Sequence, residues 1–173
     1  MNKEDKELLL KDLCSRIPYG VKILAKMSKS QYDSYKIYDK YNKFLNEGKC
    51  IGDLKMINDI GDYVLYYFTI EPCGEDEDVV NIKNIKPYLR PLETITKEER
   101  VELGKEIQKD KISPYGEIKD EGVDNLLLCT IRQSTYFQEW LLSKHFDFRG
   151  LIEKGLALEA PEGMYKYEKG GEK

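Results

Sequence analysis

Apolar residues at the start of the chain recur with the period of an α-helix. Between Lys3 and Arg16, leucines lie on one side of the predicted helix and Lys, Glu and Asp on the other, which is typical of a helix that buries one face. Pro18 and Gly20 follow, and the residue before a proline is biased away from helical backbone. The pattern therefore predicts a helix over residues 3–16.

From residue 19 to residue 90 the pattern changes to the alternation expected of β-strands. The segment Tyr63 to Ile70 is the richest in β-branched and aromatic residues, and it follows the turn signal Gly61-Asp62. Further strands are predicted at residues 21–27, at 48–58 with an interruption at Gly52-Asp53, and at 79–85. These segments predict a small antiparallel sheet or an SH3-like barrel.

Two segments of this β-rich part are predicted to lie outside central strands. Four consecutive acids, Glu75 to Asp78, follow Pro72-Cys73-Gly74 and predict a solvated hairpin loop. Pro87 and Pro91 bracket Tyr88-Leu89-Arg90, and two prolines so close together favour an extended crossover over a central strand.

The second half of the chain has helical signals. Thr96 and Glu99 have the spacing of a capping box, in which each side chain bonds the backbone amide of the other residue, and they predict a helix from Lys97 to about Asp110. An apolar stripe predicts a longer helix from Asp124 to about His145. A shorter segment rich in apolar residues follows and ends at Pro161. The fold class is therefore α+β: an N-terminal helix, a small antiparallel sheet or SH3-like barrel, and a helical C-terminal region packed on it.

Composition and charge agree with a folded chain. We expect one domain over residues 1–161, with a β-rich part at 19–90, a helical part at 96–160 and a polar tail at 162–173. Hydrophobic residues make up 40% of the 173 positions, more than a disordered chain contains. The net charge of −4 argues against a dedicated duplex-DNA binder, whose field is usually basic, but it is compatible with a local basic patch.

The ends and the cysteines favour a cytoplasmic protein. The N-terminal residues mix acids with lysines and lack the apolar core of a secretory signal. The longest uncharged apolar stretch, Tyr63 to Ile70, is far shorter than the ~18 residues that a membrane-spanning helix needs. No two of the cysteines, Cys14, Cys50, Cys73 and Cys129, have C-x-x-C spacing, so we expect reduced thiols without a zinc or redox site.

The most unusual feature is an insertion over residues 28–49 in which aromatic residues recur at every third position between lysines. The residues concerned are Tyr32, Tyr35, Tyr38, Tyr41, Phe44, Lys36, Lys40 and Lys43. They could stack on single-stranded nucleic acid, contact a protein partner, or pack onto the sheet of the same chain. Because a spacing of three drifts by about 60° per step around an α-helix, the rings cannot share one helical face, which weakens the stacking interpretation.

Arginine and acidic side chains offer further candidates. Arg90, in the restricted segment between two prolines, and Arg149 could each hold a phosphate or carboxylate through a bidentate contact, or tie two elements together. The acids Glu75 to Asp78 lack the alternate spacing and internal glycine of a calcium loop. We therefore expect no metal site there.

No catalytic motif is recognisable. His145 is the only histidine, and nothing in the sequence pairs it with a nucleophile or an orienting acid, although Asp147 is close along the chain. Neither a phosphate-binding glycine loop nor a G-x-S-x-G motif occurs. We expect no cofactor.

Two parts of the chain resemble a known group of sequences. One combines LLLKDLCSRIPYGV at residues 8–21 with IKPYLRPL at 85–92, and the other is WLLSKHFDFRGLIEKGLAL at 140–158. They resemble a family of small uncharacterised proteins from gut Bacteroides-type bacteria and their phages or mobile elements. The resemblance implies a cytoplasmic setting and a phage or prophage origin. It implies no activity, ligand or catalytic residue.

These observations leave three functional hypotheses. The first is a non-enzymatic intracellular protein-interaction module, accessory to phage or mobile-element biology. The alternative is a weak binder of single-stranded nucleic acid that uses the insertion over residues 28–49. The further alternative is an enzyme without a sequence signature. None of the three requires a membrane.

Overall fold

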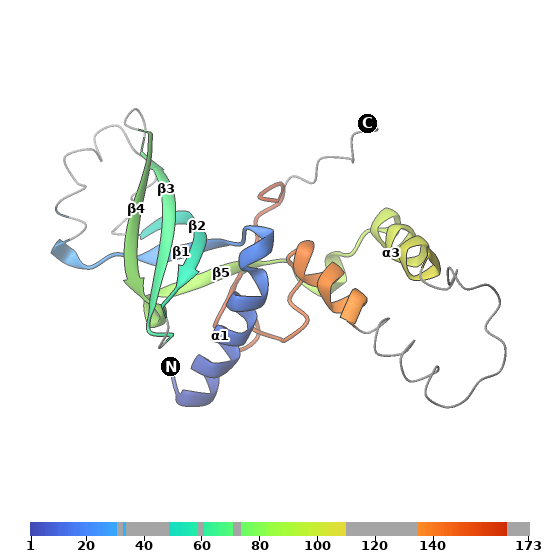
Figure 1. Cartoon of the computed structure of the whole chain (residues 1–173), viewed down its shortest axis with the longest axis horizontal. Helices are drawn as coiled ribbons and strands as arrows, with labels where there is room; N and C mark the ends of the chain where they lie inside the picture. Colours follow the sequence, from blue (N-terminus) through green and yellow to red (C-terminus); the bar gives the residue numbers. More distant parts are fainter. Residues whose placement is uncertain (31–32, 34–48, 59–60, 71–73, 110–134, 166–173) are drawn as a thin grey trace. The chain divides into compact units, whose positions relative to one another are not determined.

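The computed structural model describes residues 1–30, 33, 49–58, 61–70, 74–109 and 135–165 (Figure 1). The insertion residues that the sequence singled out, Tyr32, Tyr35, Tyr38, Tyr41, Phe44, Lys36, Lys40 and Lys43, lie outside the described residues. The chain forms two compact units. Unit 1 comprises residues 1–89 and 149–173, and unit 2 comprises residues 90–148. Each unit is described by itself below.

The N-terminal helix is confirmed with the predicted bounds. Helix α1, Lys3–Arg16, begins where the side chain of Asn2 accepts a hydrogen bond from the amide of Asp5, a cap that satisfies one of the otherwise unpaired first-turn amides. A short 3-10 turn, η1 (Ile17–Tyr19), contains Pro18 and ends at Gly20, whose φ of +70° lies in the left-handed region. The proline and glycine therefore end the helix as expected.

Unit 1 contains a six-stranded sheet (Figure 1). Its strands are β1 (Lys22–Lys26), β2 (Lys49–Ile57), β3 (Tyr63–Ile70), β4 (Gly74–Asn81), β5 (Ile85–Leu89) and β6 (Leu158–Glu159). The strand order is β4-β3-β2-β1-β5-β6, and every pair is antiparallel except β5 with β6. The predicted antiparallel sheet is therefore confirmed. The barrel is not closed, because β4 and β6 are the two edges of the sheet.

The acidic segment predicted as a loop is instead an edge strand. All of Gly74 to Asn81 pairs with β3, so that Asp76 lies opposite Phe68 and Asp78 opposite Tyr66. A strong β-forming partner such as β3 can pair with a segment of low β-propensity, and an edge position tolerates charged side chains. Strand β4 then ends at Asn81, where a 3-10 turn, η2 (Ile82–Asn84), replaces the rest of the predicted strand.

Pro87 also lies within a strand, contrary to the prediction. Strand β5 pairs with β1 on one side, with Pro87 opposite Ile23, and β6 begins on the other side only at Tyr88. At Pro87 the strand therefore has one neighbour, which is the edge-like setting that proline tolerates.

The hydroxyl of Tyr165 accepts from the amide of Lys22 and donates to the carbonyl of Tyr88, so it joins β1 to β5.

Strand β2 is continuous through Gly52, where the sequence predicted an interruption. A Cβ atom at this position would lie 2.4 Å from the carbonyl oxygen of Tyr67 and 2.6 Å from a ring carbon of Tyr66. The glycine is therefore needed for the close approach of β3 rather than for a break. The irregularity of β2 is a shift of register between Leu54 and Met56, as expected of a β-bulge.

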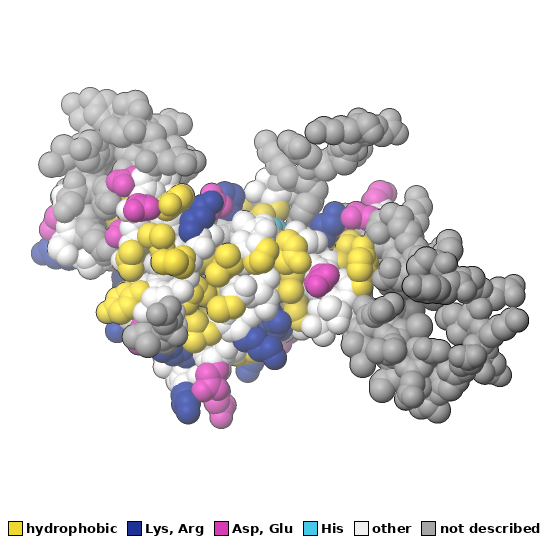
Figure 2. Space-filling model, viewed as in Figure 1, with side chains coloured by type: hydrophobic (Ala, Val, Ile, Leu, Met, Phe, Trp, Pro, Cys, Tyr) yellow, Lys and Arg dark blue, Asp and Glu magenta, His cyan; other side chains and the backbone are white. Residues whose placement is uncertain are grey.

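The core of unit 1 lies on one face of the sheet, here called the inner face. Leu9 and Leu13 of α1 join a buried cluster with Ile23 and Tyr66 of the sheet and with Leu151 from the C-terminal segment. The side chains that alternate with these strand residues point to the opposite face, here called the outer face. In the view of Figure 2, hydrophobic side chains gather over the sheet beside α1, among basic and acidic ones.

Unit 2 contains, in chain order, a 3-10 turn, η3 (Leu92–Thr94), helix α3 (Lys97–Lys109) and a helical segment at residues 135–143. The predicted capping box is confirmed: the Glu99 amide donates to Thr96 Oγ1 at 3.1 Å, and the Thr96 amide donates to the Glu99 carboxylate at 3.0 Å. Residues 149–160 belong to unit 1; they were predicted as part of the helical region, but they form turns and β6. Gly150 and Gly155 have positive φ angles of 69° and 67° there, which interrupt a helix.

No helix among the described residues has the length and apolar character needed to cross a membrane.

Candidate functional site

Arg90 is the member of the predicted binding set that the structure describes. Its guanidinium forms two bonds to the carboxylate of Glu99, of 2.7 and 3.0 Å, and lies 4.2 Å from the centre of the Phe146 ring. Phe146 in turn stacks on Trp140. Burial raises the pKa of Glu99, but hydrogen bonds from Arg90 and Thr96 outweigh it, and the net result is a lowered pKa. We interpret Arg90 as a structural residue that ties the start of α3 to the aromatic core of unit 2.

His145 lies buried in unit 2 with a φ of +58°. Its carbonyl accepts from the amide of Arg90, and the amide of Asp147 donates to the Arg90 carbonyl. The backbone at His145 thus turns to bring Phe146 beside Arg90. Among the described residues, no group of three or more His, Cys, Asp and Glu side chains could hold a metal ion.

A buried ionic cluster in unit 1 was not recognised from the sequence. Asp12 and Arg16 are fully buried on α1, with Arg16 Nε 2.6 Å and Nη2 3.1 Å from the Asp12 carboxylate. Arg149 Nη1 contacts the same carboxylate at 2.6 Å. The i, i+4 spacing of Asp12 and Arg16 could have indicated the pair. Because a buried charge needs such partners, we interpret the cluster as the attachment of the C-terminal segment to α1.

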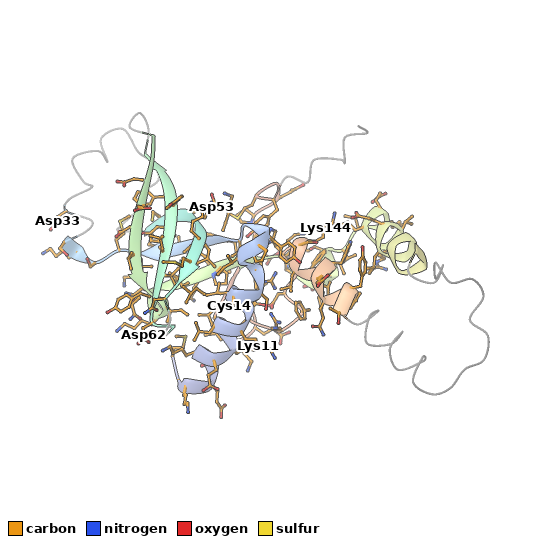
Figure 3. All side chains as sticks on the ribbon, viewed as in Figure 1. Lys11, Cys14, Asp33, Asp53, Asp62 and Lys144 are labelled. Atoms are coloured by element: carbon orange, nitrogen blue, oxygen red, sulfur yellow. The ribbon has the colours of Figure 1, made fainter. Side chains whose placement is uncertain are left out.

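The two described thiols lie in different environments. Cys50 is buried in β2 and contacts the hydroxyl of Tyr66 at 3.3 Å, and burial raises its pKa to about 11. Such a thiol is not a nucleophile at neutral pH. Cys14 is exposed on α1 (Figure 3).

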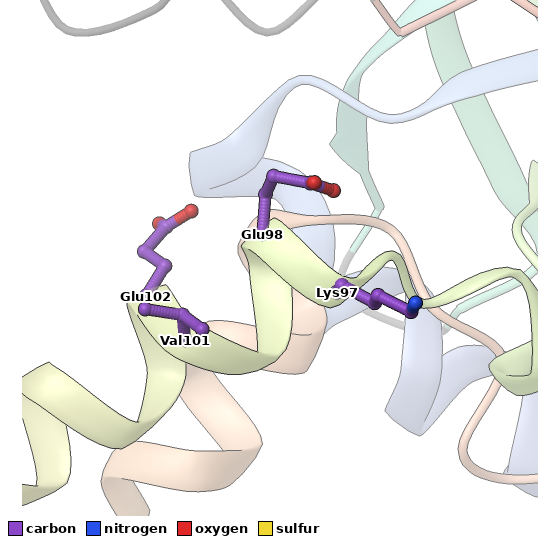
Figure 4. Close-up of a pocket in the computed structure, with 4 residues that line it drawn as sticks. All are labelled: Lys97, Glu98, Val101 and Glu102. Carbon is purple, nitrogen blue, oxygen red and sulfur yellow. The ribbon is translucent and has the colours of Figure 1, made fainter.

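A shallow hollow lies along the first turns of α3 (Figure 4). Among the described residues it is lined by Lys97, Glu98, Val101 and Glu102. Glu102 forms an ion pair of 3.0 Å with Lys144. With one aliphatic side chain and charges of both signs on a single helix, this hollow lacks the convergent polar groups of a small-molecule site.

The outer face of the sheet gathers exposed apolar side chains. Ile51, Met56 and Val79 are 40%, 55% and 49% exposed. The register places Leu24 opposite Ile51 on one row and Met56, Leu65 and Val79 side by side on another. Large aliphatic side chains gathered on one face are typical of an interaction surface rather than of a solvated one.

Lysines border this apolar surface. The charged residues of the outer face with described side chains are Lys22, Lys26, Lys49, Lys55, Lys86, Asp53 and Glu77. Among these described residues, five lysines outnumber two carboxylates, which gives an excess of three positive charges in a chain whose net charge is −4. All five lysines lie on β1, β2 and β5, whereas Glu77 lies on the edge strand β4.

Two of these lysines have partners within the sheet. Lys22 forms an ion pair of 3.0 Å with Asp53 of β2, which Figure 3 labels. The ammonium of Lys55 lies 5.4 Å from the centre of the Tyr67 ring, within the range of a cation–π contact. Sequence alternation identified the strands that carry these residues. It could not show which of their two faces α1 covers.

Comparisons of the chain with protein-family models, with curated protein sequences and with solved structures find no match.

Proposed function

We propose that the protein is a non-enzymatic interaction module that binds a protein partner through the outer face of the sheet in unit 1. The observation that carries the proposal is the exposure of Ile51, Met56 and Val79 on that one face. Burying a large aliphatic side chain contributes about 1.5–3 kcal/mol, so a partner that covers these three residues gains a substantial apolar contribution. The phage or mobile-element setting implied by the resemblance stays a prediction.

A photo-crosslinking experiment tests the proposal. We would replace Ile51 by the photo-reactive residue benzoylphenylalanine, irradiate the protein in an extract of its source cells, and look for adducts. Val101, an exposed aliphatic residue of α3, provides the matched control position. We expect adducts from position 51 that excess unlabelled wild-type protein suppresses and an excess of the Ile51→Glu variant does not. Adducts no stronger than those from position 101 would contradict the proposal.

The lysine excess on the outer face favours a second candidate function, the binding of single-stranded nucleic acid. Binding of a fluorescent oligothymidine that weakens with salt would support it. The outer face offers Tyr63 as an exposed aromatic ring, but it is less suited to base stacking because Lys55 lies over the Tyr67 ring and Ile51, Met56 and Val79 are aliphatic. The described residues add no support for the further alternative, an enzyme without a sequence signature.

A further inference from the structure

We infer that the partner presents a segment that combines acidic with apolar side chains and that its carboxylates bind beside Lys26, Lys49 and Lys86. This inference rests on the proposed function and specifies the chemistry of the partner at the same surface.

The three lysines lie around the apolar row of Leu24 and Ile51. Lys86 lies directly opposite Leu24, and Lys26 and Lys49 form the next pair along β1 and β2 on the same face. All three side chains are exposed. Within the part of the chain that the structure describes, no carboxylate pairs with any of them. A partner that places apolar side chains on Ile51 can therefore reach these ammonium groups.

The pairing of Lys26 with Lys49 is itself unfavourable. The register places these like charges directly opposite each other on adjacent strands, an arrangement that destabilises a sheet. A carboxylate placed between the two ammonium groups would convert this repulsion into attraction. The repulsion therefore favours an acidic occupant over a neutral or basic one.

The same features argue against other occupants of the outer face. A second copy of the chain packed face to face would oppose two lysine-rich surfaces, and like-charge juxtaposition at an interface is costly. Nucleic acid would supply negative charge, but among the described exposed apolar residues of the outer face Tyr63 alone is aromatic, whereas Ile51, Met56 and Val79 are aliphatic and offer no ring for stacking. A partner segment with apolar side chains flanked by carboxylates would contact the aliphatic rows and pair with the lysines at the same time.

Selection from a displayed library of random peptides tests the inference on the full chain. We expect the peptides enriched on the wild-type protein to carry net negative charge together with apolar residues. Their affinity should fall about tenfold or more, at least 1.4 kcal/mol, for the Lys26→Glu/Lys49→Glu variant. The matched control, Lys11→Glu/Lys97→Glu, reverses two exposed lysines outside the outer face and should bind like the wild type.

The outcomes separate this inference from the proposed function. Enriched peptides that lose binding to Ile51→Glu but are basic or neutral would overturn the inference and leave the proposed function in place. Enrichment that does not depend on Ile51 would overturn both. Salt-dependent binding of oligothymidine that the Lys26→Glu/Lys49→Glu variant abolishes, with no peptide enriched, would assign the face to nucleic acid instead.

Discussion

Asp12 of α1 and Arg149 form an ion pair of 2.6 Å although 137 residues separate them in the chain. Both belong to unit 1, and the Asp12 carboxylate at the same time accepts two bonds from Arg16. A single fully buried carboxylate thus holds the C-terminal segment against the N-terminal helix.

Replacing Asp12 should therefore destabilise the protein strongly. In Asp12→Ala the two arginines lose their shared acceptor inside the fold, and breaking a buried ion pair costs about 3–5 kcal/mol. The measurement is the free energy of unfolding in urea. Asp53→Ala breaks the more exposed pair with Lys22 and serves as the control, with an expected cost of about 1 kcal/mol or less. Equal losses in the two variants would contradict the structural role of Asp12.

The ion pair of Glu99 with Arg90 should make the stability of unit 2 depend on pH. The pKa of Glu99 is lowered in the folded state from its ordinary value of 4.5. A lowered folded pKa means that the stabilisation is complete above 4.5 and is lost as the pH falls through the folded value. We therefore expect Glu99→Gln to unfold more easily than the wild type near neutral pH and to approach it in acid.

Urea unfolding at a series of pH values measures this effect. The neighbouring variant Glu98→Gln, at an exposed position of the same helical turn, should follow the wild type throughout. A constant difference between Glu99→Gln and the wild type across the acid range would show that the ion pair is not responsible.

Gly52 should tolerate no side chain. In Gly52→Ala the added methyl group would meet the Tyr67 carbonyl oxygen at 2.4 Å, so β2 and β3 must move apart, which costs about 1–3 kcal/mol as in other overpacked sites. Amide hydrogen exchange should accelerate along both strands. Gly20→Asn is the comparison, because no neighbouring atom lies within 4 Å there and asparagine adopts a positive φ readily. Unchanged exchange in Gly52→Ala would refute the predicted clash.

The thiols of Cys14 and Cys50 should differ in reactivity. Cys14 is exposed, whereas Cys50 is buried and its pKa is raised to about 11, so little thiolate forms at neutral pH. We expect iodoacetamide to alkylate Cys14 rapidly and Cys50 only after unfolding in urea, as mapped by peptide mass spectrometry. Comparable rates in the native protein would mean that the strand around Cys50 opens readily.

Local signals in the sequence were sufficient where neighbouring residues carry the stabilising interactions. The capping box of Thr96 and Glu99 was predicted correctly because both of its bonds form within one helical turn. Helix α1 and strand β3 were likewise predicted with their observed bounds. The predictions at Glu75 to Asp78 and at Pro87 were wrong because a neighbouring strand, not local propensity, determines the conformation there.

For the outer face, too, some features follow from local sequence and others only from tertiary packing. Alternating residues such as Leu24, Ile51 and Val79 could be read as strand positions from the sequence alone, because the period of two is a property of the extended backbone. Which of the alternating sets faces solvent depends on α1, whose Leu9 and Leu13 cover the inner face. The sequence by itself therefore determined α1, β3 and the α+β class. Only tertiary packing decided that aliphatic side chains and lysines share an exposed face, since burial and cross-strand register arise between segments far apart in sequence.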